Sequence, residues 1–171
     1  MKSQKKKDAA LTFKLDQEVV YPLQGVGHIR SIEEIEFKDK KVLYYVIYLA
    51  VTDMVVKVPV DKAVELGIRA IVSSAEAKRA LVLISEDFEP VTADWKIRYQ
   101  MNLDLLKKGS VMDIAAVVRT LYHRSRIKEL PILERKLFDS ALKLMIDEIS
   151  FSLGKSKEDA EQLIYSKMET N

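Results

Sequence analysis

The sequence has no cysteine, and among its 171 residues only two are histidine and one is tryptophan. Without cysteine the chain can form no disulfide, no thiolate zinc site and no cysteine nucleophile, which fits a reducing cytoplasm. The two histidines, His28 and His123, stand far apart, and neither has a triad-like or metal-like set of residues near it. We therefore expect a protein that is not an enzyme and that carries no metal or cofactor.

Long hydrophobic runs are also lacking. The longest apolar stretch, residues 42–60, is interrupted by Thr52, Asp53 and Lys57, and no apolar segment follows the first residues of the chain. A membrane-spanning helix needs about 20 consecutive apolar residues, and a signal peptide needs an apolar core. We expect a cytoplasmic protein without membrane association, in which residues 1–10, with Lys5–Lys7, form a flexible basic tail.

Residues 11–68 carry the pattern of a small β domain. Short runs rich in β-branched and aromatic residues, which favour strands, begin near Glu18, His28, Val42 and Met54. The charged segment Lys38–Lys41 is typical of a hairpin tip. Several short strands within about fifty residues indicate a strongly bent sheet or an SH3-like barrel.

Residues 69–171 carry the pattern of an all-α domain, so the fold class is predicted to be α+β with a boundary between residues 60 and 73. Side chains that cap helix N-termini are predicted at Ser73, Asp94, Ser110 and Ser156. Helices are predicted to end near Gly109 and Gly154, and Pro131 suits the first position of a longer helix. A short helix is predicted between Asp61 and Gly67.

Positive charge is concentrated in one part of the helical half. The formal net charge of the whole chain is only +2, so any contact with nucleic acid has to come from locally placed charge. Residues 94–128 contain eight basic and three acidic residues, a local net charge of +5. Such a block indicates either a phosphate-contacting surface or an ordinary solvated helical face.

The single tryptophan, Trp95, lies inside this basic block. If Asp94 caps the helix, Trp95 takes the first helical position, with Lys96 and Arg98 close by. An aromatic ring with cationic neighbours can stack on an exposed base or insert at an opened base step. The alternative is that Trp95 packs between helices, with Tyr99 one turn further on in the core.

Residues 11–153 resemble the CarD family, whose first domain is shared with the polymerase-binding module of the transcription-repair coupling factor. In the strand half the matching residues are Val19, Val20, Tyr21, Pro22, Gly25, Val26, Gly27, Val56, Lys57, Val58 and Pro59. In the helical half they are Trp95, Arg98, Tyr99, Asn102, Lys108, Gly109, Val117, Val118, Arg119, Leu121, Arg124, Glu134 and Arg135. The resemblance implies a Tudor-like or SH3-like domain followed by a helical domain.

The resemblance also implies a transcription regulator that binds the RNA polymerase β subunit and stabilises the open promoter complex through its tryptophan. The residues implied for polymerase binding are Lys57, Val56, Val58 and Pro59. The residues implied for largely sequence-independent binding of promoter DNA are Trp95, Lys96, Arg98, Arg119, Arg124 and Arg135, with structural ion pairs as the alternative for Arg98 and Arg119. The chain would act as a monomer, held at the nucleoid through the polymerase.

The chain departs from the family pattern in two places. Residues 33–36 are Glu33, Glu34, Ile35 and Glu36, where relatives often carry a basic residue. Ile97 and Gln100 stand where basic residues are common after the tryptophan. These departures favour altered polymerase contacts and fewer phosphate contacts. Two other functions stay open: an adaptor that binds polymerase without touching DNA, and a nonspecific DNA-binding protein, which the small net charge disfavours.

Overall fold

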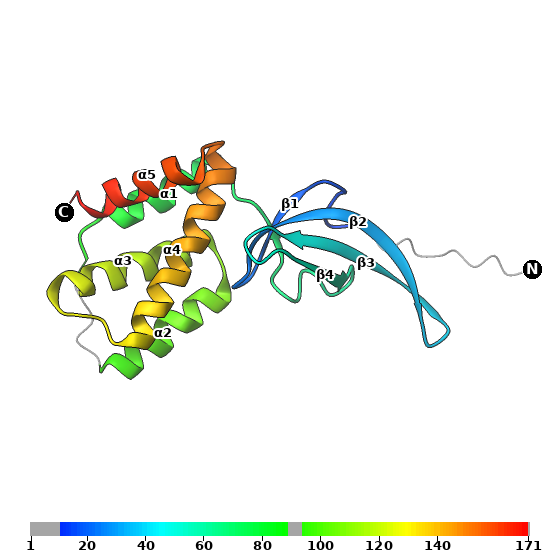
Figure 1. Cartoon of the computed structure of the whole chain (residues 1–171), viewed down its shortest axis with the longest axis horizontal. Coiled ribbons are helices and arrows are strands. Elements are labelled where there is room, and N and C mark those ends of the chain that lie inside the picture. Colours follow the sequence, from blue (N-terminus) through cyan, green and yellow to red (C-terminus); the bar gives the residue numbers. More distant parts are fainter. Residues whose placement is uncertain (1–10, 89–93, 171) are drawn as a thin grey trace, which may run out of the picture.

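The computed structural model describes residues 11–88 and 94–170, so the tail expected at residues 1–10 lies outside the described residues. Within these ranges an antiparallel five-stranded sheet is followed by five helices, which confirms the α+β class (Figure 1). The strands are β1 (Glu18–Tyr21), β2 (Gly25–Phe37), β3 (Lys40–Leu49), β4 (Met54–Pro59) and β5 (Arg69–Ala70).

The sheet is open along both sides. Its strand order is β4-β3-β2-β1-β5, and no pairing among the described strands joins β4 to β5. The strands therefore form an open, bent sheet, and an SH3-like or Tudor-like barrel stays a prediction. The register between β2 and β3 shifts between Ile29 and Ser31, and a bulge of this kind bends a strand and increases its twist.

The longest feature of the sheet is the hairpin of β2 and β3, which projects away from the helices (Figure 1). Its tip is Lys38 and Asp39, as the sequence predicts, and both residues have positive φ, 48° and 59°. Two consecutive positive φ angles match the twist of two-residue hairpin turns. Nearer the helices, the hairpin buries Ile29, Tyr45 and Ile47 in the core of the sheet.

The helices are α1 (Ser74–Ser85), α2 (Trp95–Lys108), α3 (Val111–Ile127), α4 (Ile132–Leu153) and α5 (Lys157–Met168). The predicted caps are confirmed: the side chains of Ser73, Asp94, Ser110 and Ser156 each accept a hydrogen bond from a backbone N–H in the first turn. Gly109 and Gly154 end α2 and α4 in the left-handed conformation. Pro131 precedes the first helical residue instead of occupying it. None of these helices is long and apolar enough to cross a membrane.

The segment between β4 and β5 differs from the prediction. Residues 61–67 form a run of turns in place of the short helix that was expected after Asp61. The N–H of Ile68 donates to the carbonyl of Ala63, and Gly67 has a φ of 84°. This geometry reverses the chain so that β5 can pair with β1.

The sheet and the helices meet through two adjacent carboxylates of α4, Asp147 and Glu148, which are 4 % and 1 % exposed. Asp147 Oδ2 accepts a hydrogen bond of 2.8 Å from the N–H of Val26 in β2. Glu148 accepts two hydrogen bonds, of 2.6 and 2.8 Å, from the guanidinium of Arg69 in β5. We refer to these contacts as the junction. They fix α4 against the sheet domain.

Candidate functional site

The residues predicted to bind polymerase lie on β4, which is an edge strand. Side chains alternate along it: Val58 is 3 % exposed and faces the sheet core, Val56 and Pro59 are half-buried, and Lys57 is exposed. Of these four residues, Lys57 alone is exposed, with 51 % of its side chain accessible to solvent. Val56 and Val58 can contribute mainly backbone groups to a partner, because the outer side of β4 has no paired strand in the described chain.

Lys57 has a partner within the sheet. Its ammonium donates a hydrogen bond of 3.1 Å to the carboxylate of Glu33 on β2. The Lys57 ammonium also lowers the pKa of Glu33 below its ordinary value, so this carboxylate stays ionised. Glu33, in the acidic segment that departs from the family pattern, therefore forms an ion pair with Lys57. Glu34 in the same segment forms a second ion pair with Lys41, at 3.2 Å.

Two residues of β4 that the sequence reasoning missed add an apolar surface. Met54 and Val55 are 52 % and 50 % exposed, next to Lys57 on the same strand. Exposed apolar side chains on an unpaired edge strand are unfavourable unless a partner covers them. Alternation along β4 does not predict that both are exposed, because adjacent residues of a strand point to opposite faces. The edge thus combines one cation, a neighbouring carboxylate and two exposed apolar side chains, one on each face of the strand.

The first turn of α2, the last turn of α3 and the segment that joins α3 to α4 enclose a hollow of about 230 Å³ beside Trp95. Trp95 is the first residue of α2 and is half-buried, so one part of the indole packs and the other faces solvent. Arg124 and Lys128 come from α3 and its C-terminal cap and line the same hollow. The ammonium of Lys96 lies 5.9 Å from the centre of the indole.

Arg98, which the resemblance implies for DNA binding, forms a buried ion pair in the structure and also lines the hollow. Its side chain is 7 % exposed and lies against Glu134 of α4, which is fully buried. Nε and Nη2 of Arg98 donate to Oε1 and Oε2 of Glu134, both at 2.9 Å. This bidentate pair joins α2 to α4 directly beneath Trp95. The ion pair that the sequence offers as the alternative for Arg98 is thus present, and DNA contact by Arg98 stays a prediction.

The other two arginines lie away from the hollow. Arg119 is 15 % exposed, donates to the carbonyl of Leu83 at 3.3 Å and lies 4.8 Å above the ring of Phe88. Its nearest carboxylate is Glu86, at 3.8 Å. Arg135 is exposed on α4 but does not line the hollow. Of the predicted DNA-binding residues, Trp95, Arg98 and Arg124 line the hollow together with Lys128, and Lys96 lies beside the indole.

Lys128 belongs to the basic block of residues 94–128 but is not among the DNA-binding residues that the sequence predicts. Lys128 lies near Trp95 because of the angle at which α2 and α3 pack, and this angle is set by tertiary contacts that no local sequence pattern reveals.

Within the described ranges, no group of three or more histidine, aspartate or glutamate side chains could hold a metal ion. The imidazole of His28 donates hydrogen bonds to the carboxylates of Glu18 and Asp16, which raise its pKa.

Two family models match consecutive parts of the chain. Residues 13–72 match the CarD-like/TRCF RID domain, and residues 79–165 match the C-terminal domain of CarD. This chain belongs to the CarD family. The first match covers all five strands, and the second covers the Trp95 hollow together with most of the helical domain.

A relative from Bacillus subtilis (strain 168), which bears the name "Putative transcription factor YdeB", is 32 % identical over 142 residues. The aligned region covers 83 % of this chain and 93 % of the relative.

Proposed function

We propose that this CarD-family protein binds the β subunit of RNA polymerase through the β4 edge and stabilises the open promoter complex through Trp95. The observation that carries this proposal is the Trp95 hollow, where a half-buried indole lies with the cations of Arg124 and Lys128, although the carboxylates of Asp94 and Glu129 also line it. The family matches supply the polymerase as the place of action.

The docking step uses the edge strand. A strand of the polymerase can pair with the free side of β4 through backbone hydrogen bonds, and side chains on alternate positions then provide specificity. In such an interface Met54 and Val55 would contact apolar side chains of the partner. Lys57 and Glu33 would present a positive and a negative charge at its rim. Pro59 donates no backbone hydrogen bond, so pairing is expected to end there.

The proposed contact with DNA consists of phosphate contacts and base stacking, and it involves no hydrogen bonds to the edges of the bases. We expect Arg124, Lys128 and Lys96, which lie near the indole, to contact phosphates, and phosphate contacts fix position but carry no sequence information. The indole can then stack on a base at the upstream edge of the melted region. Promoter choice comes from the polymerase, because docking raises the local concentration of the helical domain at DNA that is already bound.

Replacing Trp95 with alanine is expected to shorten the lifetime of the open complex by about five- to a hundredfold, because base stacking contributes roughly 1–3 kcal/mol. Binding to polymerase is expected to stay unchanged, since Trp95 lies on α2 and not on the sheet. The measurement is the decay of open complexes after addition of a competitor, with the wild-type and variant proteins at saturation.

The matched control is Trp95→Phe, which keeps an aromatic face and is expected to recover much of the lifetime. An unchanged lifetime with Trp95→Ala would contradict the stacking role and would favour the second candidate, an adaptor that binds polymerase without contacting DNA. The exposed side chains of Met54 and Val55 on β4 favour this adaptor, because they can bind a protein partner without any contact to DNA.

Replacing Lys57 with glutamate is expected to weaken binding to the isolated β lobe by about five- to tenfold, because the change reverses a charge at the rim of the interface. The measurement is a titration of the purified β lobe. Lys41→Glu is the matched control, since Lys41 of β3 forms an ion pair with Glu34 of β2 that is similar in length and exposure to the pair of Lys57 with Glu33. Equal loss with both variants would indicate a general charge effect and would remove Lys57 from the interface.

A further inference from the structure

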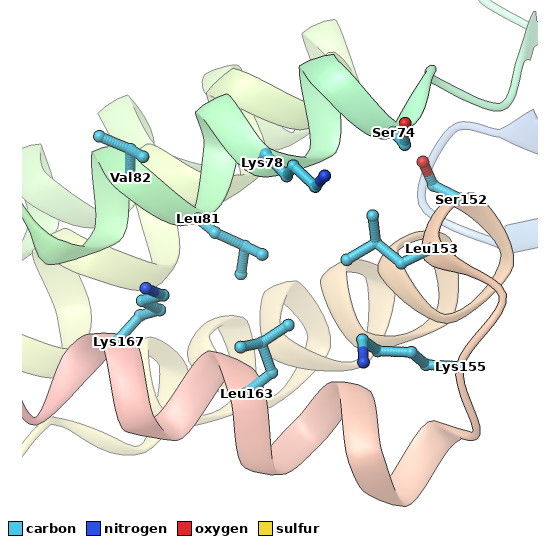
Figure 2. A pocket seen from close by; sticks show the side chains of 9 residues that line it. All are labelled: Ser74, Lys78, Leu81, Val82, Ser152, Leu153, Lys155, Leu163 and Lys167. Carbon is cyan, nitrogen blue, oxygen red and sulfur yellow. The ribbon is translucent and has the colours of Figure 1, made fainter.

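A second concave surface lies on the helical domain, between α1, the C-terminal end of α4 and α5 (Figure 2). This groove has a volume of about 530 Å³, which falls in the range of roughly 300–1,000 Å³ that is usual for ligand sites. Neither the family resemblance nor the proposed function uses it. The groove therefore needs an explanation of its own.

The floor of the groove is apolar. Leu81 of α1, Leu153 at the end of α4 and Leu163 of α5 point into the space between the helices (Figure 2). Leu81 is buried, whereas Leu153 and Leu163 are only half-buried, although both pack against the helical core. Val82, at the outer lip, is 53 % exposed. The floor is thus an extension of the core that the described chain leaves uncovered.

The rim of the groove is positive. Lys78 of α1, Lys155 from the turn between α4 and α5, and Lys167 of α5 border it, and no carboxylate lines it. None of these three ammonium groups forms an ion pair with the residues that the structure describes. Elsewhere in the described ranges Lys41, Lys57, Lys62 and Lys157 have carboxylate partners, whereas exposed lysines such as Lys136 and Lys143 form no ion pair and do not border the apolar floor of this groove. The groove therefore concentrates three uncompensated cations around an apolar floor.

We propose that this groove binds an acidic amphipathic helix of a partner protein. The three cations come from three different segments and are separated by leucines, with Lys167 toward one end of the groove and Lys155 toward the other (Figure 2). A ligand with one anionic head would engage one of them. A helix with a leucine stripe and flanking carboxylates matches all three cations and the floor at once, which is the usual mode of helix-in-groove recognition.

The location of the groove allows this partner to bind during transcription. The groove lies on α1 and α5, while the Trp95 hollow lies at the start of α2, on the opposite side of the helical domain (Figure 1). The β4 edge belongs to the sheet, on the far side of the junction. A helix in the groove would therefore leave both proposed contact surfaces free. The protein would then link a further factor to the promoter complex.

The test is an NMR titration of the isotope-labelled full chain with a synthetic helical peptide of about 14 residues, slightly longer than α5. The peptide carries leucines on one face and glutamates beside them. We expect saturable shifts of the amide signals of Val82, Leu153 and Leu163. The triple variant Lys78→Glu, Lys155→Glu, Lys167→Glu is expected to bind the peptide about tenfold more weakly or worse.

Two controls separate this proposal from general attraction and from a small-molecule site. Lys136→Glu, an exposed change on α4 outside the groove, is expected to leave peptide binding unchanged, and a peptide with lysines in place of the glutamates is expected not to bind. The proposal is overturned if the groove signals do not shift, if the triple variant binds equally well, or if dodecanoate binds the same residues more tightly and displaces the peptide.

Discussion

Replacing Glu134 with alanine is expected to lower the free energy of unfolding by about 3–5 kcal/mol, the usual cost of leaving one partner of a buried ion pair without the other. Glu134 is fully buried, and its carboxylate accepts two hydrogen bonds from the guanidinium of Arg98. For a chain of this size the loss corresponds to a fall in Tm of roughly 10 °C. Thermal unfolding followed by circular dichroism measures it.

The control for this prediction is Glu161→Ala, which removes an exposed glutamate from α5 and is expected to change the free energy of unfolding by less than about 0.5 kcal/mol. A double variant with Arg98→Met and Glu134→Leu is expected to recover most of the stability, because apolar residues of similar volume often replace a buried ion pair without loss. Equal destabilisation by Glu134→Ala and Glu161→Ala would contradict the role assigned to the pair.

The double variant also separates the two roles that the sequence left open for Arg98. If Arg98 acts only by holding α2 against α4, the double variant should keep the open-complex lifetime while it keeps the fold. A lifetime that falls although stability is recovered would show that Arg98 itself contacts DNA. This comparison requires that Trp95 stays in its place, which its indole fluorescence reports, because it is the only tryptophan in the chain.

Helix ends and the hairpin tip could be predicted because their causes are local. Ser73, Asp94 and Ser110 each cap an N–H two or three residues further on, so the whole interaction is contained in a few letters of sequence. The same is true of Lys38 and Asp39, which form the predicted tip. The positive charge near Trp95 was predictable for a similar reason, since composition alone locates it.

The parts that were missed depend on residues distant in the sequence. The sequence offers a structural ion pair for Arg98 only as an alternative, because its partner Glu134 is 36 positions away and nothing near Arg98 identifies it. Residues 61–67 have a helical composition but form turns, because the chain has to return β5 to β1. Tertiary structure often overrides local propensity in this way. The pairing of Lys57 with Glu33 likewise depends on strand register.

Replacing Glu148 with alanine is expected to loosen the junction between the sheet and the helices and to cost about 3 kcal/mol of stability. The Glu148 carboxylate accepts hydrogen bonds from Arg69 and from the N–H of Val72. Arg69 also donates to the carbonyl of Gly109, at the end of α2. One buried carboxylate therefore holds the linker after β5, and through Arg69 the end of α2, against α4.

The function proposed for this protein requires that geometry, because docking at β4 can position Trp95 only if the two domains move together. Since the natural chain has no cysteine, dyes can be attached at cysteines introduced for Lys40 on the hairpin and Glu161 on α5. Glu148→Ala is expected to broaden the distribution of distances between the dyes and to shorten the open-complex lifetime, with polymerase binding unchanged. Asp139→Ala, an exposed change on the same helix, should do neither. A distribution as narrow as that of the wild type would mean that Asp147 and apolar packing suffice to hold the junction.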